Sequence, residues 1–119
     1  MNKEKNFKVL RSSKEYKEIY QHGKSAYFGG IVIYYCFVDG DDVAGFGFAI
    51  SKKMVNAVKR NRIKRLVKES LRTTDLNSLR RMRAIIAVRK DLSMNTFADM
   101  RNSINMLIDK VQKDIEKDL

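Results

Sequence analysis

The sequence predicts an α/β protein in which amphipathic helices pack on a central sheet. Three observations support this class. Apolar runs rich in β-branched and aromatic residues at 31–38 and 43–51 are typical of strands. A basic segment at 52–72, which we expect to be helical over 59–72, precedes a third apolar run at 84–88, and this order predicts a β-α-β unit. The last part of the chain again follows helical periodicity.

The length and composition favour one domain over residues 1–119. The single cysteine, Cys36, excludes an intrachain disulfide, and its apolar neighbours favour a small buried side chain over a nucleophile. No window approaches the apolar length of a membrane span, and the first residues lack the apolar core of a secretory signal. We therefore expect a cytoplasmic protein without a membrane partner.

A first helix is predicted over 13–22. Ser12 and Glu15 have the spacing of a capping box, and Gly23 follows the last helical turn. Tyr16 and Tyr20 lie one turn apart, so both rings either pack in the core or form a stacking platform for bases. Periodicity alone favours the core.

The runs at 31–38 and 43–51 flank a turn at 39–42 and predict an antiparallel hairpin. On the second strand, Phe46, Phe48 and Ile50 share one face, which we expect to be core. The opposite face carries small residues, including Gly45 and Gly47. It has room for a packed helix or for the backbone of a ligand.

The basic segment at 52–72 carries nine Lys or Arg and one acid, about +8 of the chain's net charge of +11. Its apolar side chains fall on one helical face: Ile63, Leu66, Val67 and Leu71. On the other face, like charges follow one another at i, i+4, an arrangement that is unfavourable alone and favourable against phosphates. Nucleic acid fits better than an anionic membrane, because the helix lacks the Trp and Phe of interfacial helices.

The run at 84–88 is typical of a strand buried on both faces. Thr96 and Asp99 have capping-box spacing before a final helix that reaches about residue 117. Phe97, Met100 and Ile104 begin its apolar stripe, which we expect to be core.

No enzyme site is visible in the sequence. His22 is the only histidine, which excludes a His-based metal cluster, and there is no phosphate-binding glycine loop or nucleophile elbow. We therefore expect no catalytic residue and no metal ligand in this chain. Any reaction would use an active site supplied by another molecule.

The segment from Ile50 to Arg65 resembles the signature of the bacterial ribonuclease P protein component. The matching residues are Ser51-Lys52-Lys53 and the run from Asn56 to Arg65, in which Arg60-Asn61-Arg62 resembles the RNR motif. The resemblance also covers the first helix with Gly23 and the strand that ends before Arg89. It spans most of the chain.

The resemblance implies an α/β sandwich of the ribosomal protein S5 domain 2-like type. This fold has a central sheet of about four strands, three main helices and a left-handed β-α-β crossover. It also implies a hydrolase function, in which the protein is a subunit of the endonuclease ribonuclease P. That ribonucleoprotein removes the 5′ leader of precursor tRNA during tRNA processing. The catalytic centre is expected in the RNA subunit, with Mg²⁺ held mainly by the RNA.

Carried over by position, the resemblance implies two sets of site residues. The residues expected to bind the RNA subunit are Lys52, Lys53, Asn56, Arg60, Asn61, Arg62, Lys64, Arg65 and Lys68. Those expected to line a groove for the single-stranded leader are Tyr16, Tyr20, Tyr34 and Arg89. The implied partners are ribonuclease P RNA and precursor tRNA, without DNA.

Two other functions remain open from the residues: a ribosome-associated or general RNA-binding module, and a duplex DNA reader that places the basic helix in the major groove. The chain also departs from the family pattern at three places. Val55 replaces a usual glycine, Gly45 stands where arginine is common, and the segment 27–30 is less polar than usual.

Overall fold

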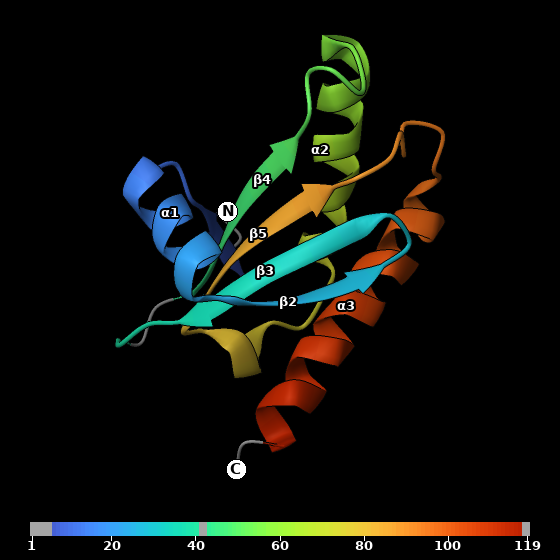
Figure 1. Cartoon of the computed structure of the whole chain (residues 1–119). Helices are drawn as coiled ribbons and strands as arrows, with labels where there is room; N and C mark the ends of the chain where they lie inside the picture. Colours follow the sequence, from blue (N-terminus) through green and yellow to red (C-terminus); the bar gives the residue numbers. More distant parts are fainter. Residues whose placement is uncertain (1–5, 41–42, 118–119) are drawn as a thin grey trace, which may run out of the picture.

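The structure is a computed structural model that describes residues 6–40 and 43–117. The elements in chain order are β1 (Phe7–Val9), α1 (Ser13–His22), β2 (Lys24–Phe28), β3 (Ile31–Phe37), β4 (Ala44–Ile50), α2 (Ala57–Arg72), a short 3-10 helix (Asn77–Leu79), β5 (Met82–Val88) and α3 (Phe97–Lys117). The strands form one mixed sheet. Figure 1 shows α1 on one face of this sheet and both α2 and α3 on the other.

The sheet has five strands in the order β1-β4-β5-β3-β2. The predicted hairpin between 31–38 and 43–51 is therefore wrong, because β5 lies between β3 and β4 and pairs with both. All residues of β5 are buried. A strand that is apolar on both faces is most stable in the centre of a sheet, where both faces are covered. Residues 41–42 of the expected turn lie outside the described residues.

The hairpin that does form joins β2 to β3. Its turn is Gly29-Gly30, with φ of 60° and 85°, a backbone conformation that glycine adopts without steric cost. This turn accounts for the less polar segment 27–30. The two edge strands, β1 and β2, are the ones that sequence patterning missed, since their polar and partly exposed residues hide the strand signal.

The predicted β-α-β unit is confirmed, since β4 and β5 are parallel and α2 connects them. In Figure 1, β5 lies to the right of β4 while α2 runs behind the sheet, so the crossover is left-handed. This hand is rare among connections between parallel strands. It agrees with the hand implied by the family resemblance.

The main core lies between the sheet and the pair α2 and α3. Ile63, Val67 and Leu71 of α2 are fully buried there, as expected from the helical periodicity. A smaller apolar cluster on the other face joins Leu10, Ile19 of α1 and Ile85 of β5. The small-residue face of β4 therefore packs against α1, which is the first of the two occupants expected from the sequence.

Two departures from the family pattern have structural explanations. Val55 is buried, and no non-glycine residue in the described part of the chain has positive φ, so the backbone there needs no glycine. A side chain at Gly45 would begin 2.7 Å from the Leu10 side chain and 2.9 Å from that of Arg83. The Arg83 guanidinium instead donates to the carbonyls of Val43 and Met82.

Candidate RNA-binding surfaces

The start of α2 is built by a side-chain cap. Asn56 is the N-cap residue, and its side-chain oxygen accepts a hydrogen bond of 2.9 Å from the Lys59 backbone N–H. The first turn contains no acid, although helix N-termini favour negative charge. The cations therefore oppose the helix dipole, and bound phosphates would relieve this conflict.

Most of the predicted RNA-subunit residues are exposed and lie together on α2 and the loop before it. We call this surface the α2 cationic face. Its exposed members are Lys52, Lys53, Asn56, Asn61, Arg62, Lys64 and Arg65, and its half-buried members are Arg60 and Lys68. Lys59 belongs to the same stretch and is also exposed, although sequence reasoning left it out of the site.

Several of these side chains are fixed by contacts within the protein. Arg62 donates through Nε to the Ser93 carbonyl at 2.6 Å, which ties α2 to the loop before α3. Arg60 donates to the Val55 carbonyl at 3.2 Å. Lys59 pairs with Asp91 at 3.2 Å. The pKa of the Asp91 carboxyl is lowered first by Ser93, whose backbone N–H donates to it at 2.9 Å, and then by the Lys59 ammonium. The face is therefore partly preorganised for a polyanion.

Phe48 differs from its predicted place in the core. It is half-buried, and the Lys68 ammonium lies 5.6 Å from the centre of its ring. Alternation along the strand placed Phe48 on the correct face. However, β1 pairs only with residues 44–46, so the part of β4 that contains Phe48 lies at the edge of the sheet. The alternation of residues along β4 does not reveal this edge position.

On the opposite face of the sheet, Tyr20, Tyr34 and Arg89 form what we call the aromatic cluster. The Tyr20 and Tyr34 rings meet edge to face with centroids 5.1 Å apart, and the Arg89 guanidinium donates to the Tyr34 hydroxyl at 2.6 Å. The Tyr20 side chain is 48% exposed. Its partial burial, and then the neighbouring Tyr34, raise the pKa of the Tyr20 hydroxyl. The cluster thus offers an aromatic edge and a cation side by side.

Tyr16 has a different environment from Tyr20. Its hydroxyl accepts a hydrogen bond of 2.9 Å from the Phe48 backbone N–H, and its ring lies where a side chain on Gly47 would be. Gly47 therefore makes room for the ring, and Tyr16 supports the edge of β4 beyond the end of β1. Within the predicted leader set, Tyr16 is half-buried and contacts the edge of β4, whereas Tyr20 is exposed.

This difference gives a stability prediction. Replacing Tyr16→Phe should lower the free energy of unfolding by about 1 kcal/mol, because the Phe48 N–H loses its protein acceptor. Urea unfolding would measure the change. Tyr20→Phe is the matched control and should leave stability unchanged; equal losses in both variants would contradict this role of Tyr16.

Tyr27 is an aromatic residue that sequence reasoning did not select. It pairs directly with Val32, whose side chain shares a sheet face with Tyr34 two residues later, and it is 58% exposed. It therefore extends the aromatic face toward β2. Only the strand pairing brings it there, so no sequence signal could have found it.

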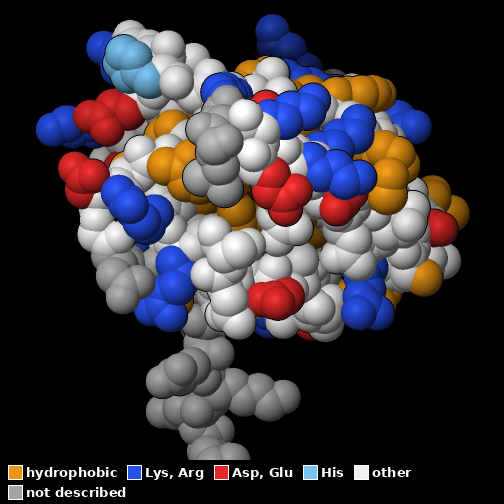
Figure 2. All heavy atoms as spheres, turned by 90° about the horizontal axis from the view of Figure 1, so that it is seen from below, with side chains coloured by type: hydrophobic (Ala, Val, Ile, Leu, Met, Phe, Trp, Pro, Cys, Tyr) orange, Lys and Arg blue, Asp and Glu red, His pale blue; other side chains and the backbone are white. Residues whose placement is uncertain are grey.

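Cations of the two surfaces lie at the same end of the sheet. Ile50 of β4 and Val88 of β5 are register partners, so Lys52 and Lys53 after β4 leave the sheet at the same end as Arg89 after β5. Figure 2 views the molecule from the other end, where Lys and Arg side chains alternate with Asp and Glu.

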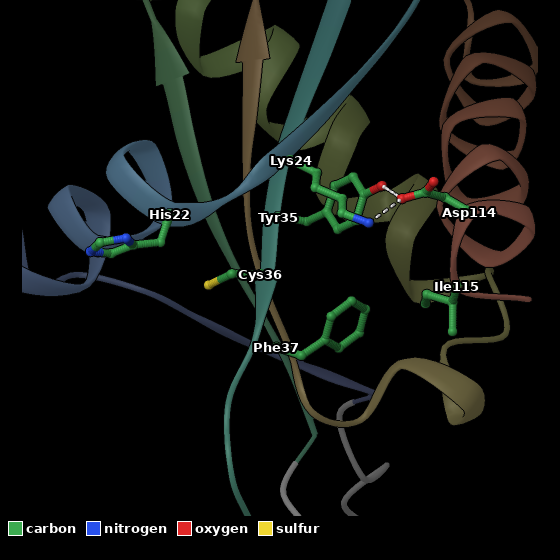
Figure 3. Close-up of a pocket in the computed structure, with 7 residues that line it drawn as sticks. All are labelled: His22, Lys24, Tyr35, Cys36, Phe37, Asp114 and Ile115. Atoms are coloured by element: carbon green, nitrogen blue, oxygen red, sulfur yellow. Dashed lines mark hydrogen bonds and ion pairs between the residues drawn. The ribbon is translucent and has the colours of Figure 1, made fainter. Parts of the chain in front are cut away.

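Within 6–40 and 43–117, no group of three or more His, Cys, Asp or Glu side chains could hold a metal ion. Burial, and to a lesser extent the nearby Glu18 carboxylate, raise the pKa of the Cys36 thiol. Figure 3 shows the His22 ring turned away from this thiol. No helix in the described part of the chain is long and apolar enough to span a membrane.

Figure 3 also shows how the end of α3 is fastened to the sheet. Asp114 accepts a hydrogen bond of 2.7 Å from the buried Tyr35 hydroxyl and pairs with Lys24 at 3.3 Å. The Tyr35 hydroxyl, followed by Lys24, lowers the pKa of this carboxyl. These groups are paired with one another and serve the fold.

Together these features define a class: a small basic α/β protein suited to nucleic acid, with a cationic helix and an aromatic cluster. Comparison with known proteins then gives the family. The family described as Ribonuclease P matches residues 5–112. The chain belongs to this family and functions as a protein component of ribonuclease P.

Individual relatives agree over nearly their whole length. The ribonuclease P protein component of Caldanaerobacter subterraneus subsp. tengcongensis is 32% identical over 109 residues, covering 92% of this chain and 93% of the relative. The Staphylococcus aureus RNase P protein structure superposes with a TM-score of 0.74 at 25% identity, over 87% of this chain and 94% of that one. The Thermotoga maritima RNase P protein structure superposes with a TM-score of 0.70 at 25% identity, over 84% of this chain and 94% of that one.

Proposed function

We propose that this protein binds ribonuclease P RNA through the α2 cationic face and the 5′ leader of precursor tRNA through the aromatic cluster. The single observation that supports this division is their placement. The exposed lysines after β4 and Arg89 of the aromatic cluster lie at one end of the sheet, whereas α2 and the Tyr20–Tyr34 pair lie on different faces of it. One RNA can therefore be held on each face without competition.

The chemistry of each surface fits its proposed ligand. Cations on α2 neutralise phosphates and give affinity without reading sequence. Unpaired leader bases present flat faces that aromatic side chains bind whatever the sequence. A general RNA-binding module would need only the first surface, and nothing in the comparisons favours that alternative.

The reaction chemistry belongs to the RNA subunit in this proposal. Mg²⁺ prefers oxygen ligands and usually keeps several waters, which phosphate oxygens of a folded RNA satisfy. The protein contributes binding and positioning of the substrate. We propose that it does so in the cytoplasm, as one domain over residues 1–119.

Reconstitution tests this function. A bacterial ribonuclease P RNA should cleave precursor tRNA faster with this protein than without it at low Mg²⁺, because the protein's cations replace part of the ionic screening. The advantage should shrink as Mg²⁺ rises. Cleavage at the 5′ leader junction would be followed on a gel with end-labelled substrate.

Two results would count against the proposal. One is the absence of stimulation at any Mg²⁺ concentration although the protein binds the RNA, which would favour the general RNA-binding module. The other is displacement of the protein from the RNA subunit by an equimolar DNA duplex, which would favour a major-groove reader.

A further inference from the structure

A recess lies between α2 and the first turn of α3, beside the arginines of the α2 cationic face. It has a volume of about 350 Å³ and is lined by Arg62, Arg65, Leu66, Glu69 and Phe97. This size is at the small end for ligand sites and is enough for one nucleobase. Phe97, the aromatic residue of this recess, is not among the site residues predicted from the sequence.

Phe97 is exposed although the helical pattern predicts it to be core. The ring is 41% exposed, whereas Met100 and Ile104, which follow it on the same stripe, are fully buried. The apolar stripe of α3 thus continues one turn beyond the core. The fold itself has little use for a large aromatic side chain at this position.

The position of Phe97 is nevertheless well fixed. It is the first residue of α3, and a reciprocal capping box surrounds it. The Thr96 N–H donates to the Asp99 carboxylate and the Asp99 N–H donates to the Thr96 hydroxyl, both at 3.1 Å. The capping box orders the backbone at Phe97, so the start of α3 presents the ring without a backbone rearrangement.

The charges around the recess select a nucleotide over a simple apolar ligand. Arg62 is held at Nε by the Ser93 carbonyl, so its terminal nitrogens are available for a phosphate, and Arg65 lies one turn further along α2. Glu69 pairs with Arg72 and disfavours phosphate at its side of the recess. An aromatic face with cations on one side matches a base with its flanking phosphates.

We propose that an unpaired base of ribonuclease P RNA occupies this recess, stacked on Phe97, with its flanking phosphates bound by Arg62 and Arg65. The proposal rests on the proposed function, since it names one contact within the RNA-subunit interface. It adds to that interface a stacking site from α3, which the basic motif on α2 does not contain.

Substitution of Phe97 gives the first test. Phe97→Ala should weaken binding of a bacterial ribonuclease P RNA by roughly 5- to 160-fold, the range for loss of one stacked base. The salt dependence of binding should not change, because no phosphate contact is removed. Phe97→Tyr should bind like the wild type. Met106→Ala, which removes another exposed apolar side chain of α3, is the control and should have no effect.

The absence of tryptophan from the chain allows a second, direct test. Phe97→Trp places the only tryptophan of the chain in the recess, and its indole emission should change strongly when the RNA subunit binds, because a stacked base quenches indole. Met106→Trp should respond little. This readout does not depend on the stability of the alanine variant.

The outcomes separate this inference from the proposed function. If the wild type binds the RNA subunit and stimulates cleavage but Phe97→Ala binds equally well, the stacking site is wrong and the function stands. An unchanged Phe97→Trp emission in the bound complex would also overturn it. If the wild type itself does not bind the RNA subunit, the proposed function fails as well.

Discussion

Replacing both Arg62 and Arg65 by Ala should weaken RNA-subunit binding at least roughly tenfold and lower the slope of log affinity against log salt by about two. Both side chains are exposed, lie on one side of α2 and lack a carboxylate partner among the described contacts. Each lost phosphate contact removes about one released counterion. Filter binding between 50 and 200 mM salt would measure both quantities.

A matched pair separates local contacts from total charge. Lys113→Ala with Lys117→Ala removes the same formal charge from the last turns of α3, far along the chain and outside the α2 cationic face. This pair should leave the slope nearly unchanged. Equal slopes for the two double variants would mean that net charge, not the α2 face, binds the RNA.

Arg62→Lys adds a further distinction. The lysine keeps the positive charge but lacks the guanidinium that donates to the Ser93 carbonyl. The salt slope should therefore remain, while any loss of affinity reports how much the tie between α2 and the loop before α3 matters.

Replacing Tyr20→Ala should weaken binding of precursor tRNA to the reconstituted enzyme by about 1 to 3 kcal/mol and leave mature tRNA binding unchanged. Tyr20 lies on α1 and is the most accessible ring of the predicted leader set. Its ring contacts that of Tyr34 on β3. Only precursor tRNA has unpaired leader bases that can stack there. Equilibrium binding of both tRNAs would measure the difference.

Two controls accompany this variant. Tyr20→Phe keeps the ring and should keep the preference for precursor tRNA. Phe37→Ala removes an exposed aromatic side chain from the other sheet face and should not change the preference. An equal loss for precursor and mature tRNA in Tyr20→Ala would show that Tyr20 serves the fold instead.

The sequence predicted the strongly periodic elements well. α1 spans 13–22 as expected from Ser12 and Gly23, and α3 reaches Lys117. The helix α2 and the fully buried β5 were also predicted, because charge, apolar periodicity and uninterrupted apolar runs are local properties. The concentration of cations on α2 and the family resemblance are likewise sequence properties.

Strand pairing was not predictable in the same way. The runs at 31–38 and 43–51 satisfy the local signals of a hairpin, but β5 separates them. The competition is decided by burial, since a strand that is apolar on both faces is most stable with a neighbour on each side. β1 and β2 then occupy the edges, where their polar residues cost little.

From the sequence alone it follows that this protein carries a basic amphipathic helix, contains no recognisable catalytic constellation and resembles the ribonuclease P protein component. Only the tertiary structure distinguished Tyr16, which holds the edge of β4, from the accessible Tyr20. It alone placed Tyr27 on the aromatic face and left Phe97 exposed beside Arg62 and Arg65. The physical reason is that exposure depends on what packs against a side chain, and those neighbours come from distant parts of the chain.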